Sequence, residues 1–312
     1  MSCDLPCLIL NTGARMPILG LGTYEVKGSE KMHLIIDAAL ETGYRAFDTA
    51  AVYGNEADLG SALQDLMPKY GLTREDIFLI SKLSPADMGP RAREGCARSL
   101  ERLGIGGYID LYLIHCPGTK WLEPGDVKNS QNRAQSWAVL EELHGQGAIR
   151  SIGVSNYTVL HLEELLHSCT VPPALLQVEF HPKLAQLELR TFCMEKGIVF
   201  QAYSSRGKGG LLSNSEIVAV ADEHGRTSAQ VLLRWAIQQG VAVLPPRPRP
   251  SVRENGKVFD FVLEERGMQR LFDMDSGVRF CKRDPTLVVG TTTAPLVIYR
   301  PILLRLLLLT GK

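Results

Sequence analysis

Short apolar runs alternate with longer amphipathic stretches along most of the chain. From Glu56 to Met67, for example, apolar residues recur at helical spacing, with Leu59, Ala62, Leu63 and Leu66 on one face. The apolar runs lack polar alternation, which is typical of a parallel sheet that helices cover on both faces. Strands are predicted at 44–48, 77–82, 109–115, 149–154, 175–179, 198–203 and 241–244. Helices are predicted at 29–42, 56–67, 92–103, 134–145, 159–167, 187–195 and 229–239.

This alternation predicts a closed barrel. With a further strand that ends near Gly22, it gives eight strand–helix units, which fits a (β/α)8 TIM barrel. An open doubly wound sheet would carry Gly-x-Gly-x-x-Gly after its first strand, and the run that begins at Gly20 lacks the third glycine. A β-hairpin is predicted at 5–19, with 11–13 as its turn. We therefore expect residues 1–285 to form one α/β barrel with an N-terminal β-hairpin.

The last residues, 286–312, do not continue the alternation. They contain an apolar run at 301–309 that Arg305 interrupts and that is shorter than the roughly 20 residues of a membrane span. We expect an atypical apolar C-terminal tail that the barrel does not need. An interfacial helix, a partner-binding segment and an end without selected function all remain open for it.

Composition narrows the class of partner. Lys plus Arg and Asp plus Glu both number 34, so no net field attracts nucleic acid or an anionic membrane. The seven cysteines are scattered and form no C-x-x-C pair, which indicates reduced thiols rather than disulfides or a zinc site. We expect a cytoplasmic monomer that acts on a small molecule, with no nucleic-acid partner and no membrane span.

Three polar residues end three successive predicted strands. Asp48, Lys82 and His115 are each about one βαβ repeat of roughly 30 or more residues apart. Equal spacing places them at one height on the carboxyl rim, where barrels keep their active sites. An isolated Lys is usually solvated and an isolated His usually structural, but three in register favour a functional site.

These residue types suit acid chemistry near Tyr53. A free tyrosine has a pKa of about 10, and a neighbouring ammonium such as that of Lys82 would lower it. Asp48 would hold Lys82 charged, and His115 would orient a substrate oxygen. One His, one Asp and one Lys do not form a metal shell, so no metal is expected. No Ser or Cys lies in a strand-to-helix elbow, which disfavours a nucleophilic triad.

The run from Gly43 to Gly60 and the run Gly153-Val154-Ser155-Asn156-Tyr157 match the two signatures of one known family. By these motifs the sequence resembles the aldo-keto reductases over residues 5–265. The likeness is greatest to the glyoxal and 2,5-diketogluconate reductase branch. It implies NADPH-dependent reduction of small aldehydes and ketones.

The resemblance also implies roles for single residues. It makes Tyr53 the general acid, Lys82 the partner that lowers its pKa, Asp48 the partner of Lys82, and His115 the carbonyl-orienting group. It implies NADPH as cofactor, with NADH as a weaker donor. The implied cofactor-binding residues are Thr23, Asp48, Ser155, Asn156, Gln177, Tyr203, Ser204, Arg247, Arg253, Glu254 and Asn255. Among these, Ser155, Asn156 and Gln177 would bind the nicotinamide carboxamide and Tyr203 would stack on the ring. The implied substrate-binding residues are Tyr24, Ser84, His115 and Cys116.

The chain departs from the family pattern in the cofactor loops. Where the family has Lys-Ser or Lys-Thr, this chain has a run of prolines and arginines at 246–253, seemingly one residue shorter. Arg206 replaces a usual Leu in the loop after the seventh strand. Ser84 and Cys116 replace tryptophans of some relatives, so a roomier pocket is expected. These changes leave open an alternative, a catalytically impaired nucleotide-binding barrel that serves as a binding or regulatory protein.

Overall fold

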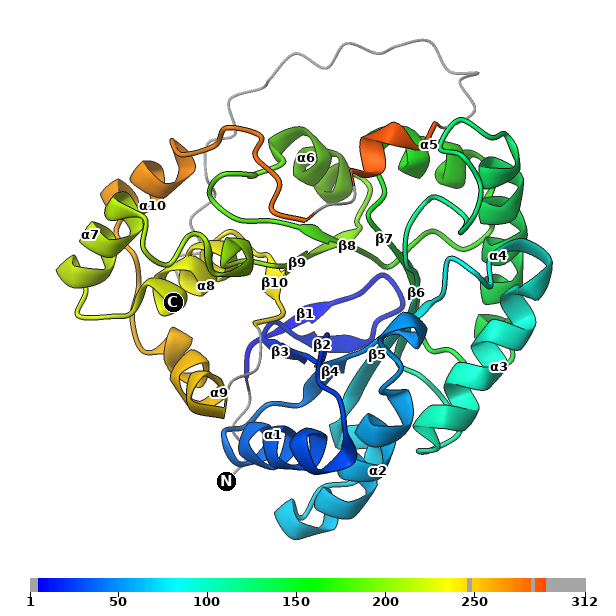
Figure 1. The fold of residues 1–312 in the computed structure, drawn as a ribbon, viewed down its shortest axis with the longest axis horizontal. Helices are drawn as coiled ribbons and strands as arrows, with labels where there is room; N and C mark the ends of the chain where they lie inside the picture. Colours follow the sequence, from blue (N-terminus) through cyan, green and yellow to red (C-terminus); the bar gives the residue numbers. More distant parts are fainter. Residues whose placement is uncertain (1–4, 246–248, 282–283, 290–312) are drawn as a thin grey trace.

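Eight parallel strands form a barrel at the centre of the molecule (Figure 1). The structure is a computed structural model that describes residues 5–245, 249–281 and 284–289. The strands are β3 (Gly20–Gly22), β4 (Ala46–Asp48), β5 (Phe78–Leu83), β6 (Leu111–Ile114), β7 (Ile152–Ser155), β8 (Leu175–Glu179), β9 (Val199–Tyr203) and β10 (Ala242–Val243). They pair in sequence order from β3 to β10. A parallel bridge between Leu19 and Val243 joins the first strand to the last, so the predicted (β/α)8 barrel is confirmed.

The predicted N-terminal hairpin is also confirmed. It consists of β1 (Cys7–Ile9) and β2 (Arg15–Pro17), which pair antiparallel. In its turn, the Asn11 side chain donates to the carbonyl of Pro172 (3.2 Å), and Thr12 Oγ1 lies 2.8 Å from Ser151 Oγ. Ser151 and Pro172 precede β7 and β8, so the hairpin covers the amino ends of the strands. The carboxyl rim is left for chemistry.

Helices surround the barrel as an outer ring (Figure 1). The α-helices are α1 (Ser29–Glu41), α2 (Glu56–Leu66), α3 (Ala92–Leu103), α4 (Lys128–Gly145), α5 (Val159–Ser168), α6 (Leu187–Glu195), α7 (Ser215–Glu223), α8 (Ser228–Gln238), α9 (Arg249–Gly256) and α10 (Glu265–Phe272). Short 3-10 helices are η1 (Ala51–Tyr53), η2 (Pro68–Tyr70), η3 (Arg74–Asp76), η4 (Gly89–Arg91), η5 (Gly207–Gly209), η6 (Lys257–Phe259) and η7 (Pro285–Leu287). No described helix has the length and apolar character to cross a membrane.

The hydrophobic core lies between the strands and this ring. All six residues of β5 are buried, as expected for a strand covered on both faces. Trp137 of α4 and Trp235 of α8 are among the largest fully buried side chains and pack the helices onto the barrel. A rigid barrel of this kind fixes the heights of its strand ends and so positions the loops that follow them.

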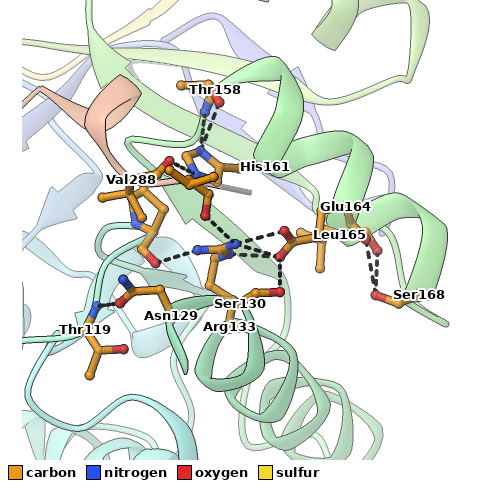
Figure 2. A network of polar contacts seen from close by, with 12 residues as sticks. Thr119, Asn129, Ser130, Arg133, Thr158, His161, Glu164, Leu165, Ser168 and Val288 are labelled. Carbon is orange, nitrogen blue, oxygen red and sulfur yellow. Dashed lines mark hydrogen bonds and ion pairs between the residues drawn. The ribbon is translucent and has the colours of Figure 1, made fainter. Parts of the chain in front are cut away.

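The first residues of the expected tail contact this body (Figure 2). The Val288 carbonyl accepts a hydrogen bond from His161 Nε2 of α5 (2.8 Å). The Val289 amide donates to the carbonyl of Pro124 (3.2 Å), and its carbonyl lies 3.5 Å from the Arg133 guanidinium. Residues 286–289 therefore pack near α4 and α5. Residues 290–312, including Arg305, lie outside the described residues.

Candidate active site

A buried ion pair lies where β4 and β5 end. Lys82 Nζ donates to Asp48 Oδ1 (2.6 Å), to Asp48 Oδ2 (2.7 Å) and to the carbonyl of Thr49 (2.9 Å). These contacts use all three ammonium protons. Lys82 is 1% exposed and Asp48 is 3% exposed. Buried charges of this kind persist only when they are paired and hydrogen-bonded, as here.

Burial sets the electrostatics of the pair. It raises the pKa of Asp48 and lowers the pKa of Lys82, because both charged forms lose hydration. The attraction between the two groups opposes both shifts. Removing either partner would leave an uncompensated charge in a dry site.

Tyr53 and His115 lie beside this pair. Tyr53 ends η1, and its ring centroid is 5.1 Å from Lys82 Nζ. The His115 ring is 5.8 Å away in an edge-on arrangement, and the Tyr24 ring packs at 5.1 Å on another side. The structure thus brings together the four residues that the spacing and the family resemblance single out.

Burial dominates the electrostatics of Tyr53, and the effect expected of Lys82 stays a prediction. Burial and the nearby Asp48 carboxylate raise the pKa of Tyr53 well above its ordinary value. The Lys82 ammonium lies 5.1 Å from the Tyr53 ring centroid, and its three protons are donated to Asp48 and Thr49.

Asn55 fixes the two loops that carry the aromatic side chains. Its side chain is buried, its Nδ2 donates to the carbonyls of Thr23 and Val26 (both 2.9 Å), and its Oδ1 accepts from Thr49 Oγ1 (2.7 Å). The sequence reasoning missed this role. An Asn directly before α2 resembles an N-cap, but its side chain makes no capping bond and joins neighbouring loops instead.

Gln177 extends the network from the ion pair across the barrel. Its Nε2 donates to Asp48 Oδ2 and to Gln201 Oε1, both at 2.8 Å. Gln201 is buried within β9 and was not predicted as a site residue. Its signal is an amide in the middle of an otherwise apolar strand.

Asn156 joins the ends of β6, β7 and β9. It follows β7 with a left-handed backbone (φ 61°), which Asn tolerates better than most residues. Its Nδ2 donates to the carbonyl of His115 (2.9 Å) and to Ser155 Oγ (3.1 Å), and Tyr203 OH donates to its Oδ1 (2.6 Å). The Asn156 amide is therefore satisfied within the protein. A carboxamide bound here would replace one of these partners.

The remaining rim residues also have hydrogen-bond partners within the protein. Thr23 Oγ1 donates to the carbonyl of Asp48 (2.9 Å), and Ser84 Oγ accepts from the amide of Ala86 (3.1 Å). Two further short contacts are Cys116 Sγ to the Gly118 carbonyl (3.2 Å) and Ser204 Oγ to Cys281 Sγ (3.4 Å). Among the described residues, no group of three or more His, Cys, Asp or Glu side chains could hold a metal ion.

Residues of α9 form a second, separate part of the predicted site. The Arg253 guanidinium donates to Glu41 Oε2 of α1 (2.5 Å), and Thr227 Oγ1 donates to Glu254 Oε1. Asn255 is 0% exposed, and neither its Nδ2 nor its Oδ1 has a hydrogen-bond partner among the described residues. Arg247 lies outside the described residues.

The unpartnered amide of Asn255 indicates which part of a nucleotide this place near α9 could bind. An Asn side chain can pair with the N6 and N7 edge of adenine, because it offers one donor and one acceptor side by side. Buried amides are almost always hydrogen-bonded, so this pair of free atoms fits an adenine base.

Comparison with known proteins agrees with this geometry. The model of the aldo/keto reductase family matches residues 18–275, and the chain belongs to this family. The resemblance seen in the sequence is thereby confirmed. Members of the family reduce carbonyl groups with a nicotinamide nucleotide, so the chain is an oxidoreductase by class.

Three relatives illustrate the likeness. An aldo-keto reductase of Mycolicibacterium vanbaalenii is 42% identical over 92% of this chain and 98% of its own length. The glyoxal reductase of Bacillus subtilis is 39% identical over 84% of this chain and 90% of its own length. The crystal structure of an aldo/keto reductase from Brucella melitensis superposes with a TM-score of 0.78 at 34% identity, covering 87% of this chain and all of that one.

Proposed function

We propose that the protein is an NADPH-dependent reductase of aldehydes and ketones in which Tyr53 is the general acid. The observation that carries this proposal is the buried Asp48–Lys82 pair beside Tyr53 and His115 on the carboxyl rim. When bound, a reduced nicotinamide supplies hydride to the carbonyl carbon. In this proposal, the protein acts in the cytoplasm as a monomer.

The chain supplies the proton and the orientation. His115 positions the carbonyl oxygen near the Tyr53 hydroxyl. The raised pKa of Tyr53 keeps that hydroxyl protonated at neutral pH. As the carbonyl is reduced, its oxygen gains alkoxide character and becomes a far stronger base than a phenolate. Proton transfer from Tyr53 thus remains favourable, and Lys82 stabilises the phenolate that is left.

Small or polar carbonyls are the proposed substrates. Ser84 and Cys116 are small residues, and Tyr24 remains as the exposed aromatic near Tyr53. A pocket with few aromatic walls offers little apolar surface to a large substrate. The likeness to the glyoxal reductase of Bacillus subtilis supports the same choice.

NADPH oxidation tests the proposal. The purified protein is assayed with methylglyoxal and 4-nitrobenzaldehyde, alongside Tyr53→Phe and the control Tyr70→Phe. Tyr70 OH donates to Asp37 Oδ1 (2.7 Å), and Tyr70 lies in η2, away from the rim. We expect kcat to fall about 100-fold or more in Tyr53→Phe only, because general acid catalysis contributes on that order. Equal rates for the wild type and Tyr53→Phe across a carbonyl panel would refute the enzyme and favour the silent nucleotide-binding barrel.

A further inference from the structure

A cavity of about 350 Å³ lies on the amino side of the barrel, where β9 and β10 begin. Residues of β1, of α6, of the start of β9 and of the turn before β10 line it. The lining is mostly apolar, and its members Ile9, Leu187 and Met194 are 57%, 38% and 60% exposed. Small-molecule sites have volumes of roughly 300–1,000 Å³ and walls of this kind. The chemistry of the carboxyl rim uses none of these residues.

Arg190 of α6 brings a cation into this apolar lining. Its Nη1 donates to Gln239 Oε1 (2.8 Å), and its guanidinium carbon lies 5.1 Å from the centroid of the Phe180 ring. Gln239 is itself oriented, because its Nε2 donates to the carbonyl of Trp235 (2.8 Å). The guanidinium is therefore held in one place by the protein before any ligand binds.

The described part of the chain offers the Arg190 guanidinium no ion-pair partner. Burial lowers the pKa of Arg190 to about 10, and no described carboxylate opposes this shift. The side chain is half-buried and still charged at neutral pH. Charges that lose hydration are normally paired in proteins. A bound carboxylate would supply the partner that the protein does not.

We propose that this cavity binds a small amphipathic carboxylate, such as a medium-chain fatty acid, with its carboxylate on Arg190 and its alkyl chain on the apolar walls. The planar fork of Arg matches the two oxygens of a carboxylate. Residues 290–312 are also rich in apolar side chains, but they contain no Asp or Glu to pair with Arg190. A free carboxylate therefore fits the cavity better than this segment does.

Calorimetric titration of the full chain with hexanoate, octanoate and decanoate tests the site. Each buried CH₂ group raises affinity about fourfold, so we expect Kd to fall about 15-fold for every two carbons until the cavity is full. Octanol has the same alkyl chain without the charge. We expect it to bind about tenfold or more weakly than octanoate, because the charge-assisted contact with Arg190 is missing.

Three variants test the role of Arg190. Arg190→Gln should weaken octanoate binding about tenfold or more, and Arg190→Lys should recover part of the loss. In Met194→Glu the new carboxylate lies four residues after Arg190 on α6, so it can pair with the guanidinium and should also weaken octanoate binding about tenfold or more. Arg15→Gln is the matched control and should leave the affinity unchanged. Arg15 is an exposed cation that pairs with Ile9 in the hairpin but does not line the cavity.

Several outcomes would overturn the inference. These are no saturable binding of the three carboxylates by the wild type, equal affinities of wild type and Arg190→Gln, and octanol that binds as tightly as octanoate. Octanoate binding by a chain that ends after Val289, but not by the full chain, would assign the cavity to residues 290–312. A dimer in sedimentation that octanoate does not dissociate and that Met194→Glu disrupts would assign it to a second copy.

Thermal unfolding of each variant separates a lost contact from a misfolded helix. Met194 is exposed, so Met194→Glu keeps the test decisive even if Arg190→Gln does not fold. A folded Met194→Glu that binds octanoate as tightly as the wild type would refute the site.

Discussion

Gln177 donates one amide proton to Asp48 and the other to Gln201, so the buried ion pair is hydrogen-bonded to a residue of the proposed nicotinamide site. A ligand that displaces Gln177 would change the hydrogen bonding of Asp48. In the proposed complex with the nicotinamide at Gln177, this one side chain would couple nucleotide binding to the hydrogen bonding of Asp48.

Replacing Gln177 with Leu removes both bonds. Asp48 and Gln201 would each lose a buried partner, so the free energy of unfolding should fall by about 1–3 kcal/mol, and NADPH should bind more weakly. Urea denaturation and fluorescence titration measure the two effects. Gln146→Leu is the control, because Gln146 is exposed and bonds only at the surface to Glu142. Equal stability of Gln177→Leu and wild type would contradict the prediction.

The Asp48–Lys82 pair should show strong coupling. Asp48→Asn or Lys82→Met alone leaves a buried charge uncompensated, which typically lowers the free energy of unfolding by about 3–5 kcal/mol. The double variant should be more stable than the sum of the two losses predicts. The surface pair of exposed Lys69 and half-buried Asp37, at 2.6 Å, provides a comparison cycle with a coupling of at most about 1 kcal/mol. Additive effects at Asp48 and Lys82 would refute the coupling.

His161 should make stability depend on pH. Its Nδ1 accepts from the Thr158 amide (3.2 Å), so Nε2 carries the proton donated to Val288. Burial lowers the pKa of His161 from 6.5 to about 4. The unfolded chain then binds more protons between these values, and stability is lost as pH falls from about 6.5 to 4, by at most about 3 kcal/mol.

Urea denaturation between pH 4 and 7 measures this slope. His161→Gln should flatten it, because the titrating group is gone while an amide donor to Val288 remains. His167→Gln, a change of an exposed histidine on the same helix, is the control. A slope that is the same in His161→Gln as in the wild type would place the titration elsewhere.

Two truncations test whether residues 286–289 stabilise the barrel. The sequence predicts that removal of 286–312 leaves the thermal transition nearly unchanged. The bonds from His161 and Arg133 to Val288 and Val289 lead us to expect a clear loss of stability instead. A chain that ends after Val289 keeps these bonds and should melt at a higher temperature than one that ends after Pro285. Identical melting of the two would show that residues 286–289 contribute nothing.

NADPH should bind more tightly than NADH, by a smaller margin than an intact Lys-Ser loop would give. Arg247→Ala should lower the affinity for NADPH about tenfold and leave the affinity for NADH unchanged, since one charge-assisted contact is lost. Arg253→Ala should have a smaller effect, because Glu41 already engages that guanidinium. Fluorescence titration of both nucleotides measures the margin. Equal affinities that neither substitution changes would show that this loop does not bind the phosphate.

The sequence was sufficient to predict those site residues whose positions depend on the register of the barrel strands. Asp48, Lys82 and His115 follow from the barrel repeat, because parallel strands of one barrel end at a common rim. The ranges of α3 and α6 agree with the prediction, while α4 begins at Lys128 rather than near residue 134. Helix α7 was missed.

Side-chain pairing within the site could not be predicted in this way. Asn55 bonds to loops that come earlier in the chain, and Arg253 turns to Glu41 on α1. The raised pKa of Tyr53 depends on burial and on the neighbouring Asp48 carboxylate. These features arise from contacts between distant segments, which local patterns of residues do not encode.

The bridge between Leu19 and Val243 has a consequence for how the chain folds. During synthesis β3 is the first barrel strand to emerge, yet its outer edge has no partner until β10 leaves the ribosome. An unpaired strand edge can bind other extended chains, so a growing chain is open to misassociation throughout. Contacts between such distant residues also slow folding. The barrel therefore cannot close until the two-residue strand β10 has been synthesised and has paired.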